Sequence, residues 1–147
     1  MKVIHTGQNN ERLAGSVVCL GYFDGVHLGH MALIDTAKAI ADQYGLLCCV
    51  HALDRSPAQV LHPERSVPLL TSLEDKIQLF AEAGVEVLAI TPFDEHVLHM
   101  PGQAFFDDIL LKSLNAKALV VGDDHRFGYR GDTGARELQR MCSKANM

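Results

Sequence analysis

Short apolar runs alternate with longer segments in which apolar residues recur every three or four positions. The short runs predict four strands, at residues 16–21, 46–53, 85–93 and 116–122. The longer segments predict four helices, at residues 30–44, 71–84, 101–115 and 132–144. Strands that are separated by helical crossovers pair in parallel. The sequence therefore predicts an α/β fold, an open parallel sheet flanked by helices.

Residues at the ends of the predicted helices support these boundaries. Gly45 and Gly84 follow helical segments, where glycine readily ends a helix. Thr71 and Ser72 are candidate N-caps, with Glu74 or Asp75 near the reciprocal position of a capping box.

Three polar loops follow predicted strands, at residues 21–30, 54–68 and 122–132. Ligands of open α/β sheets bind at the carboxyl ends of the strands, near the point where the strand order reverses. We therefore expect these three loops to meet at one edge of the sheet and to form the ligand site.

The loop GYFDGVHLGH, residues 21–30, combines groups that suit a bound anion. Gly21, Gly25 and Gly29 allow close approach to the backbone, and the following helix offers free N–H groups and the positive end of its dipole. His27 and His30 can donate hydrogen bonds near neutral pH, and Asp24 can hold a divalent cation. An ordinary strand-to-helix turn is the alternative. The loop lacks the GxGxxG and GxxxxGK[ST] spacings, which disfavours a hydride-transfer enzyme or a P-loop kinase.

Composition narrows the class of protein. The chain of 147 residues fits one domain, and its net charge of −5 argues against nonspecific nucleic-acid binding. No apolar run reaches the roughly 20 residues of a membrane span, and no signal-peptide core begins the chain, so we expect no membrane association and a cytoplasmic location. Cys19, Cys48 and Cys49 lie in apolar runs and no CxxC spacing occurs, which argues against a disulfide or zinc framework.

Taken together, the motifs resemble a known family. GYFDGVHLGH is similar to the phosphate-binding signature of the FMN adenylyltransferase (FAD synthetase) domain in bacterial bifunctional riboflavin kinase/FAD synthetases, and its HxGH core is shared with the wider nucleotidyltransferase superfamily. The similarity continues through residues 68–93 and 105–134, which include VVGDDHRFGYRG. It implies a Rossmann-like nucleotidyltransferase fold.

The resemblance implies that AMP is transferred from ATP to FMN, giving FAD and pyrophosphate, with Mg²⁺ accompanying the ATP. It implies that His27 and His30 are catalytic and contact the ATP phosphates. The residues that the resemblance assigns to the ATP pocket are Gly21, Phe23, Asp24, Gly25, His27, Gly29 and His30.

The resemblance also implies that the flavin lies over the second and fourth loops. It assigns Pro57, Asp124, Phe127 and Gly128 to flavin binding. Two positions depart from the family pattern, because Leu53 and His125 stand where the family has phenylalanine. These departures bear on flavin affinity more than on the ATP pocket.

Comparison with the family predicts that residues 1–147 are a truncated FMN adenylyltransferase domain, without the C-terminal Ser/Thr-Ser-Thr-x-x-Arg segment and without the riboflavin kinase domain to which it is normally fused. Three alternatives stay open: another HxGH adenylyl- or cytidylyltransferase, a noncatalytic nucleotide or flavin binder, and a metal-binding protein that uses His96 and His99.

Overall fold

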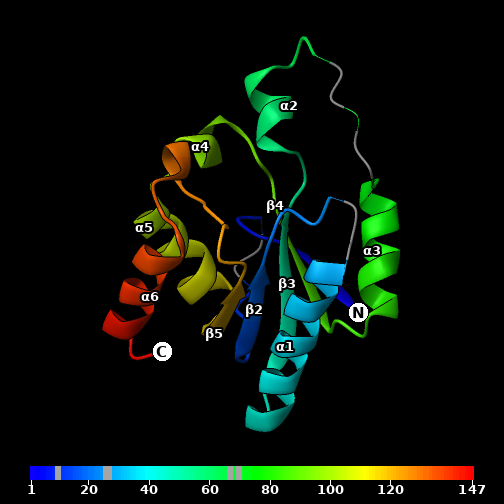
Figure 1. Cartoon of the computed structure of the whole chain (residues 1–147), viewed down its shortest axis with the longest axis vertical. Helices are drawn as coiled ribbons and strands as arrows, with labels where there is room; N and C mark the ends of the chain where they lie inside the picture. Colours follow the sequence, from blue (N-terminus) through cyan, green and yellow to red (C-terminus); the bar gives the residue numbers. More distant parts are fainter. Residues whose placement is uncertain (9–10, 25–27, 66–67, 69–70) are drawn as a thin grey trace.

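In the computed structural model, which describes residues 1–8, 11–24, 28–65, 68 and 71–147, a parallel sheet of five strands runs through the molecule (Figure 1). The strand order is β1-β4-β3-β2-β5, and every neighbouring pair is parallel. The strands are β1 (Lys2–His5), β2 (Ser16–Leu20), β3 (Leu47–Leu53), β4 (Val87–Thr91) and β5 (Ala116–Val121). The predicted fold class is confirmed.

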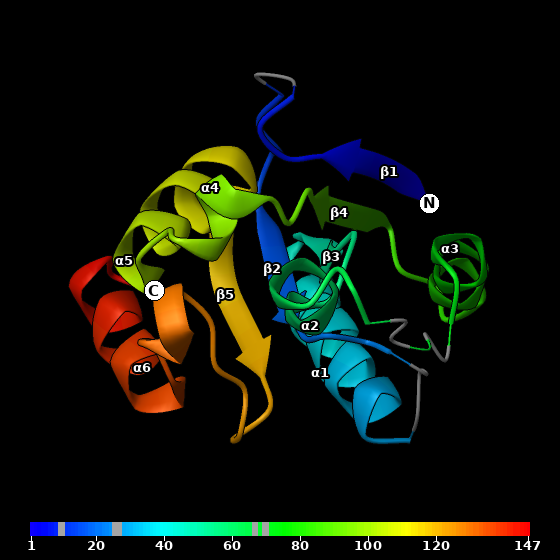
Figure 2. The same cartoon turned by 90° about the horizontal axis from the view of Figure 1, so that it is seen from above.

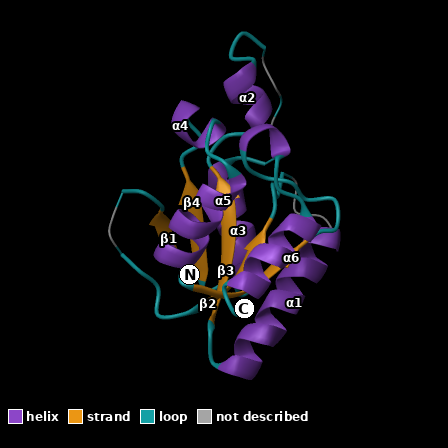
Figure 3. Ribbon diagram, turned by 90° about the vertical axis from the view of Figure 1, so that its left-hand side faces the viewer, coloured by secondary structure: helices purple, strands orange, loops and turns teal. Residues whose placement is uncertain are grey.

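Helices cover both faces of the sheet, as the view from above shows (Figure 2). One face is covered by α1 (Leu28–Tyr44) and α3 (Leu73–Glu82). The other is covered by α5 (Gly102–Phe105), the π-helix η1 (Phe106–Ser113) that continues it, and α6 (Ala135–Lys144). The short helices α2 (Pro57–Leu61) and α4 (Glu95–Leu98) lie above the sheet (Figure 3).

Alternation along the buried strands creates two apolar layers. In β2, Val17 and Cys19 pack toward α1 and α3, whereas Val18 and Leu20 pack toward the helices on the other face. All five residues of β2 are buried, which explains why its sequence is continuously apolar rather than alternating. Cys19, Cys48 and Cys49 are buried free thiols, as the apolar runs around them predict.

The four predicted strands and four predicted helices are present, with ends that shift by up to three residues. The capping box that begins α3 joins Ser72 to Asp75: the Asp75 N–H donates to Ser72 Oγ at 3.1 Å, and the Ser72 N–H donates to Asp75 Oδ2 at 3.4 Å. The predicted helix 101–115 is α5 followed by η1.

Four elements were not predicted: β1, α2, α4 and the single turn η2 (Tyr129–Gly131). β1 pairs only with β4 at the edge of the sheet and buries little, so its four residues carry no clear periodicity. α2 lies inside the segment that we predicted to be a loop. It begins with a capping box between Ser56 and Gln59, with Pro57 at its first position.

The order of strands places a switch point beside β2. From β2 the chain moves outward to β3 and then β4, and it later returns to form β5 on the opposite side of β2. The loops that leave β2, β3 and β5 therefore meet above the centre of the sheet, at the edge where ligands of such folds bind. This is the arrangement that the sequence predicts.

Candidate functional site

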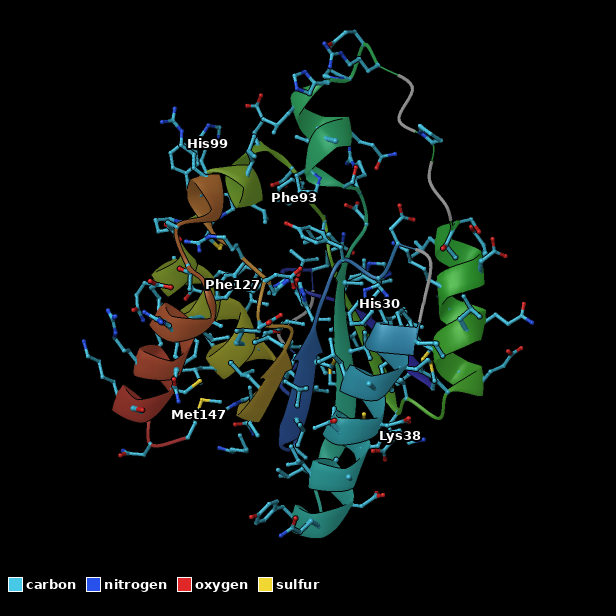
Figure 4. The ribbon with its side chains drawn as sticks, in the orientation of Figure 1. His30, Lys38, Phe93, His99, Phe127 and Met147 are labelled. Atoms are coloured by element: carbon cyan, nitrogen blue, oxygen red, sulfur yellow. The ribbon has the colours of Figure 1, made fainter. Side chains whose placement is uncertain are left out.

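A hollow of about 380 Å³ lies where the end of β2, the start of α1 and the loop after β5 meet. We call it the helix-end hollow. Gly29 and His30 line it from the first turn of α1, and Asp124 lines it from the opposite loop. His30 lies at the end of α1 that is nearest the carboxyl edge of the sheet (Figure 4). The helix-end hollow thus joins a helix N-terminus, an imidazole and a carboxylate.

Phe23 anchors the imidazole of His30. Its side chain is fully buried, its ring centroid lies 4.9 Å from that of His30, and on its other side it meets Phe80 of α3 edge to face at 5.3 Å. Phe23 adopts a left-handed backbone conformation, with φ of 49°, which is uncommon for a bulky residue. A Cβ at Gly21 would lie 2.8 Å from the Phe23 ring, so glycine is what allows this ring to turn inward.

The helix-end hollow has the chemistry of an anion site. The first N–H groups of a helix lack intrahelical partners and carry the positive end of the dipole, and α1 is 17 residues long. Glycine at position 29 leaves the backbone accessible, and the imidazole of His30 can add a hydrogen bond or a positive charge. A phosphate group fits this combination.

A second hollow, of about 180 Å³, lies across Gly21 and Tyr22 from the first. We call it the aromatic hollow, because six ring-bearing residues line it: Tyr22, His51, Phe93, Phe105, His125 and Phe127. Five of these rings form a continuous row in which each ring contacts the next. The centroid separations are 5.8 Å for Tyr22–His125, 6.1 Å for His125–Phe127, 5.2 Å for Phe127–Phe105 and 5.3 Å for Phe105–His51. Such a wall favours a planar aromatic ligand.

The two imidazoles of this wall are held in the neutral form. Burial, with the nearby His125, lowers the pKa of His51 to about 3. Its Nε2 lies 2.7 Å from Thr91 Oγ1, which in turn lies 2.6 Å from Thr6 Oγ1. Burial also lowers the pKa of His125, while the adjacent Asp124 acts in the opposite direction. The interior of the aromatic hollow is therefore uncharged near neutral pH.

The loop after β5 is fixed by close packing at Gly128. This residue has φ of 83°, and a Cβ there would lie 2.6 Å from the backbone nitrogen of Gly102. Asp132 holds the same region, since Oδ1 accepts hydrogen bonds from the Gly102 N–H at 3.1 Å and from the Thr133 hydroxyl at 2.8 Å. Phe127, which pairs with Thr133 in a β-bridge, is thereby directed into the aromatic hollow.

The structure brings most of the predicted site residues to these hollows. Gly21, Gly29 and His30 line the helix-end hollow, whereas Pro57, Phe127 and Gly128 line the aromatic hollow. Gly21 borders both. Gly25 and His27 lie outside the described residues.

Three predicted residues have positions that differ from what their assignments suggest. Asp124, assigned to the flavin, lines the helix-end hollow with His30. Asp24, assigned to the ATP pocket, lines a third and smaller hollow beside Lys76. Phe23, assigned to the ATP pocket, has no exposed surface and borders the helix-end hollow through its contact with His30.

The alternative metal site finds no counterpart in the part of the chain that the structure describes. There, no group of three or more His, Cys, Asp or Glu side chains is close enough to hold an ion. His99 instead places Nδ1 2.7 Å from the carbonyl oxygen of Glu95, and its ring lies 5.2 Å from that of Tyr129.

Of the six wall residues, sequence reasoning assigned only Phe127 to a site and missed Tyr22, His51, Phe93, Phe105 and His125. His51 carried a usable signal, because it is a polar residue inside an otherwise apolar strand. Phe93 and Phe105 are indistinguishable from core residues in the sequence. Only the fold brings them to the hollow.

Comparison with known proteins agrees with this geometry. The model of the FAD synthetase family matches residues 9–147. The chain belongs to the FAD synthetase family. The suspected resemblance is thereby confirmed.

Curated relatives carry the name bifunctional riboflavin kinase/FMN adenylyltransferase. The protein from Bacillus subtilis (strain 168) is 39% identical over 136 residues, which is 89% of this chain and 43% of the relative. That from Listeria monocytogenes is 38% identical over 127 residues, 86% of this chain and 40% of the relative. That from Escherichia coli (strain K12) is 35% identical over 114 residues, 78% of this chain and 36% of the relative. The chain spans less than half the length of each of these relatives.

A solved structure has the same fold. The crystal structure of a macrolide-efflux protein from Streptococcus pneumoniae superposes with a TM-score of 0.79 at 26% identity, covering 95% of this chain and 47% of the other. In the described part of this chain, no helix has the length and apolar character needed to cross a bilayer.

Proposed function

We propose that this chain transfers AMP from ATP to FMN, forming FAD and pyrophosphate. The observation that carries the proposal is the adjacency of two complementary hollows. The helix-end hollow and the aromatic hollow share Leu20, Gly21, Tyr22 and His125 as a common wall. A phosphate chain in the first and a planar flavin in the second would bring their reacting groups together at that wall.

The aromatic hollow suits the isoalloxazine ring of FMN. A planar aromatic ligand gains stacking and edge contacts from the ring wall and needs no charge in the interior. Arg126 and Arg130 line the same hollow and are exposed, so their positive charges lie at its rim, on the side open to solvent. Phe127, Gly128 and Pro57 are proposed as flavin-binding residues on this basis.

The reaction requires alignment rather than a general base. The FMN phosphate has a second pKa of about 6 and is largely dianionic at neutral pH, so its oxygen can attack the α-phosphorus of ATP directly. A P–O bond forms at the α-phosphorus, the bond to the bridging oxygen of the β-phosphate breaks, and pyrophosphate leaves with that electron pair. Positioning and electrostatic stabilisation supply the catalysis.

Gly29 and His30 are proposed to bind the ATP phosphates. The N–H groups at the start of α1 would bind phosphate oxygens, and the imidazole of His30 would offset the negative charge that develops on pyrophosphate. His27 and Gly25 are proposed to act with them on the ground of the family motif. Phe23 keeps the His30 ring in place.

Asp124 fits the Mg²⁺ that accompanies ATP. Mg²⁺ is held in proteins by one or two carboxylates together with substrate phosphates, and Asp124 is an exposed carboxylate in the hollow that contains His30. The ion would supply charge neutralisation on the phosphate chain. Asp24, which faces a different hollow, is less well placed for this role than Asp124.

The proposal concerns residues 1–147 as an adenylyltransferase domain. The kinase activity in the relatives' names is not assigned to these residues. A cytoplasmic location stays a prediction.

The direct test is to incubate the chain with ATP, Mg²⁺ and FMN and to separate the products by chromatography. We expect FAD and pyrophosphate in equal amounts, and both to form about 10²- to 10³-fold more slowly with His30→Ala. The control variant is His62→Ala, which removes an exposed imidazole from outside the hollows and should leave product formation unchanged. Product from CTP or from a nonflavin acceptor instead of FMN would indicate another HxGH transferase, and binding of FMN and ATP without product would indicate a noncatalytic binder.

A further inference from the structure

A third, smaller hollow lies beside Tyr22, between the loop after β3 and the start of α3. We call it the lysine hollow, because Lys76 of α3 lines it. The Lys76 residue is only 9% exposed. Among the described residues, no hydrogen bond or ion pair holds its ammonium group. No fully buried side-chain nitrogen or oxygen of the described residues lacks a hydrogen-bond partner, so the ammonium group of this mostly buried lysine is accessible from the lysine hollow.

The carboxylates nearby are already engaged. Asp54 accepts a hydrogen bond from the Phe93 N–H at 2.7 Å through Oδ1, and its Oδ2 lies 3.7 Å from Nε of Arg55. Asp24, which also lines the lysine hollow, has an interaction partner of its own. The two carboxylates line the same hollow as Lys76, so their negative charges reduce the cost of burying its ammonium group.

The lysine hollow lies at the junction of the two larger hollows. Tyr22 lines all three hollows, and Leu53 lines both the aromatic hollow and the lysine hollow. A ligand whose ring occupies the aromatic hollow can therefore extend past Tyr22 toward Lys76, and so can a phosphate chain that begins at His30.

Ring contacts tie Lys76 to the rest of the site. Phe80 is one helical turn after Lys76 on α3 and meets Phe23 at 5.3 Å, and Phe23 meets His30 at 4.9 Å. This chain of three rings fixes α3 against the loop that carries the phosphate-binding motif. The ammonium of Lys76 and the imidazole of His30 are thus held on elements that pack directly together.

We propose that Lys76 is a phosphate-binding residue, whose ammonium group binds a phosphate of one of the two substrates in the lysine hollow. This inference rests on the proposed function and adds to it a cationic group outside the GYFDGVHLGH motif. An ammonium group is a point charge with three donors, which suits a phosphate oxygen. The phosphate belongs either to FMN or to ATP, and each substrate has a counterpart without phosphate that distinguishes the two.

The test compares four ligands with matched variants. Dissociation constants of FMN, riboflavin, ATP and adenosine are measured for the unmodified chain, Lys76→Met, Lys76→Arg and Lys117→Met. Lys117 is exposed at the amino end of β5, so its variant has the same change of net charge away from the site. We expect Lys76→Met to weaken one phosphate-bearing ligand about 10- to 100-fold, to leave its counterpart without phosphate unchanged, and Lys76→Arg to recover part of the loss.

The pattern of losses decides the assignment. Loss for FMN but not riboflavin assigns the FMN phosphate, and loss for ATP but not adenosine assigns the triphosphate. Equal loss for a ligand and its counterpart, or no loss for any ligand, overturns the inference and leaves Lys76 as a structural residue of α3. If Lys76→Met does not fold, Lys76→Gln is measured in its place and the same criteria apply. Failure of the unmodified chain to bind either FMN or ATP would instead contradict the proposed function.

Discussion

In the helix-end hollow, the groups proposed to bind phosphate follow one another within the ten residues 21–30, and Asp124 is the main addition from elsewhere. The aromatic hollow on the other side of Gly21 and Tyr22 collects its rings from the loop after β2, from β3, from the segment after β4, from α5 and from the loop after β5. The first site is therefore formed mostly by one segment of the sequence, whereas the second depends on the relative positions of four strands and one covering helix. We therefore expect substitutions in the helix-end hollow to lower kcat and substitutions in the aromatic hollow to weaken flavin binding.

The largest effect is expected from His30→Ala. Loss of the group that offsets charge on the departing pyrophosphate should lower kcat by about 10²- to 10³-fold, while the dissociation constant of FMN stays within about twofold. Steady-state kinetics and flavin fluorescence titration measure the two quantities on the same preparation. An unchanged kcat would remove His30 from the mechanism, and a parallel loss of FMN binding would mean that the two hollows are not separable.

Gly21→Ala should change the helix-end hollow indirectly, by displacing the buried Phe23 ring that packs against His30. The added methyl group would lie 2.8 Å from the Phe23 ring, so the ring and the His30 that packs on it must move. We expect kcat to fall about tenfold and the free energy of unfolding to fall by about 1–3 kcal/mol, as in other overpacked cores. Gly15→Ala, just before the same strand, is the control, because its added methyl group meets flexible side chains, Leu46 Cδ2 at 3.2 Å and Lys117 Cγ at 3.9 Å. Equal effects of the two variants would contradict the proposed support of His30 by Phe23.

The ease of predicting each hollow follows from how it is built. His30, Gly29 and Gly21 could be assigned from the sequence, because glycine and histidine at a strand-to-helix turn have few structural reasons to occur together. Phe93 and Phe105 could not, because a phenylalanine that lines a cavity and one that fills a core look alike in a sequence. The position of Asp124 opposite His30 depends on the register of β5 beside β2, which no local pattern specifies.

The elements of the fold also differ in how well the sequence predicts them. Strands that are buried on both faces were predicted closely, β2 to within one residue and β4 to within two at each end. The edge strand β1 was missed because it has few buried residues, and α2 was missed although Ser56, Pro57 and Gln59 form a recognisable helix start. Charged and proline-rich surroundings obscured that signal.

The pH dependence of stability tests whether the imidazole of His51, which lines the aromatic hollow, is neutral in the folded chain. Its pKa is about 3 in the folded chain and 6.5 in the reference state, so between these values only the unfolded chain binds the proton. The contribution of His51 to stability is complete above pH 6.5 and decreases as the pH falls toward 3, by up to about 1.4 kcal/mol per pH unit. Urea unfolding of the unmodified chain and of His51→Val from pH 7 to pH 5 should give a difference in free energy that shrinks with falling pH. His5→Val, on the exposed edge strand, is the control, and a difference for His51→Val that stays constant with pH would show that the buried imidazole is not neutral.

The smallest effect is expected from Phe127→Ala. It should weaken FMN binding and leave kcat unchanged, which is the reverse of His30→Ala. Removing the ring takes away its contacts with Phe105 and His125 and one surface for the flavin, while the backbone of the loop stays fixed by Gly128 and Asp132. A lost aromatic contact of about 0.5–1.5 kcal/mol corresponds to FMN binding that is weaker by up to about tenfold. The dissociation constant of ATP and the value of kcat at saturating FMN should change by less than about twofold, since neither depends on the aromatic hollow.

Tyr44→Ala, which removes an exposed ring at the far end of α1, should leave all three quantities unchanged. If Phe127→Ala instead lowers kcat as much as it weakens FMN, the flavin ring must be positioned by Phe127 in the transition state, and the aromatic hollow would then contribute to catalysis as well as to binding.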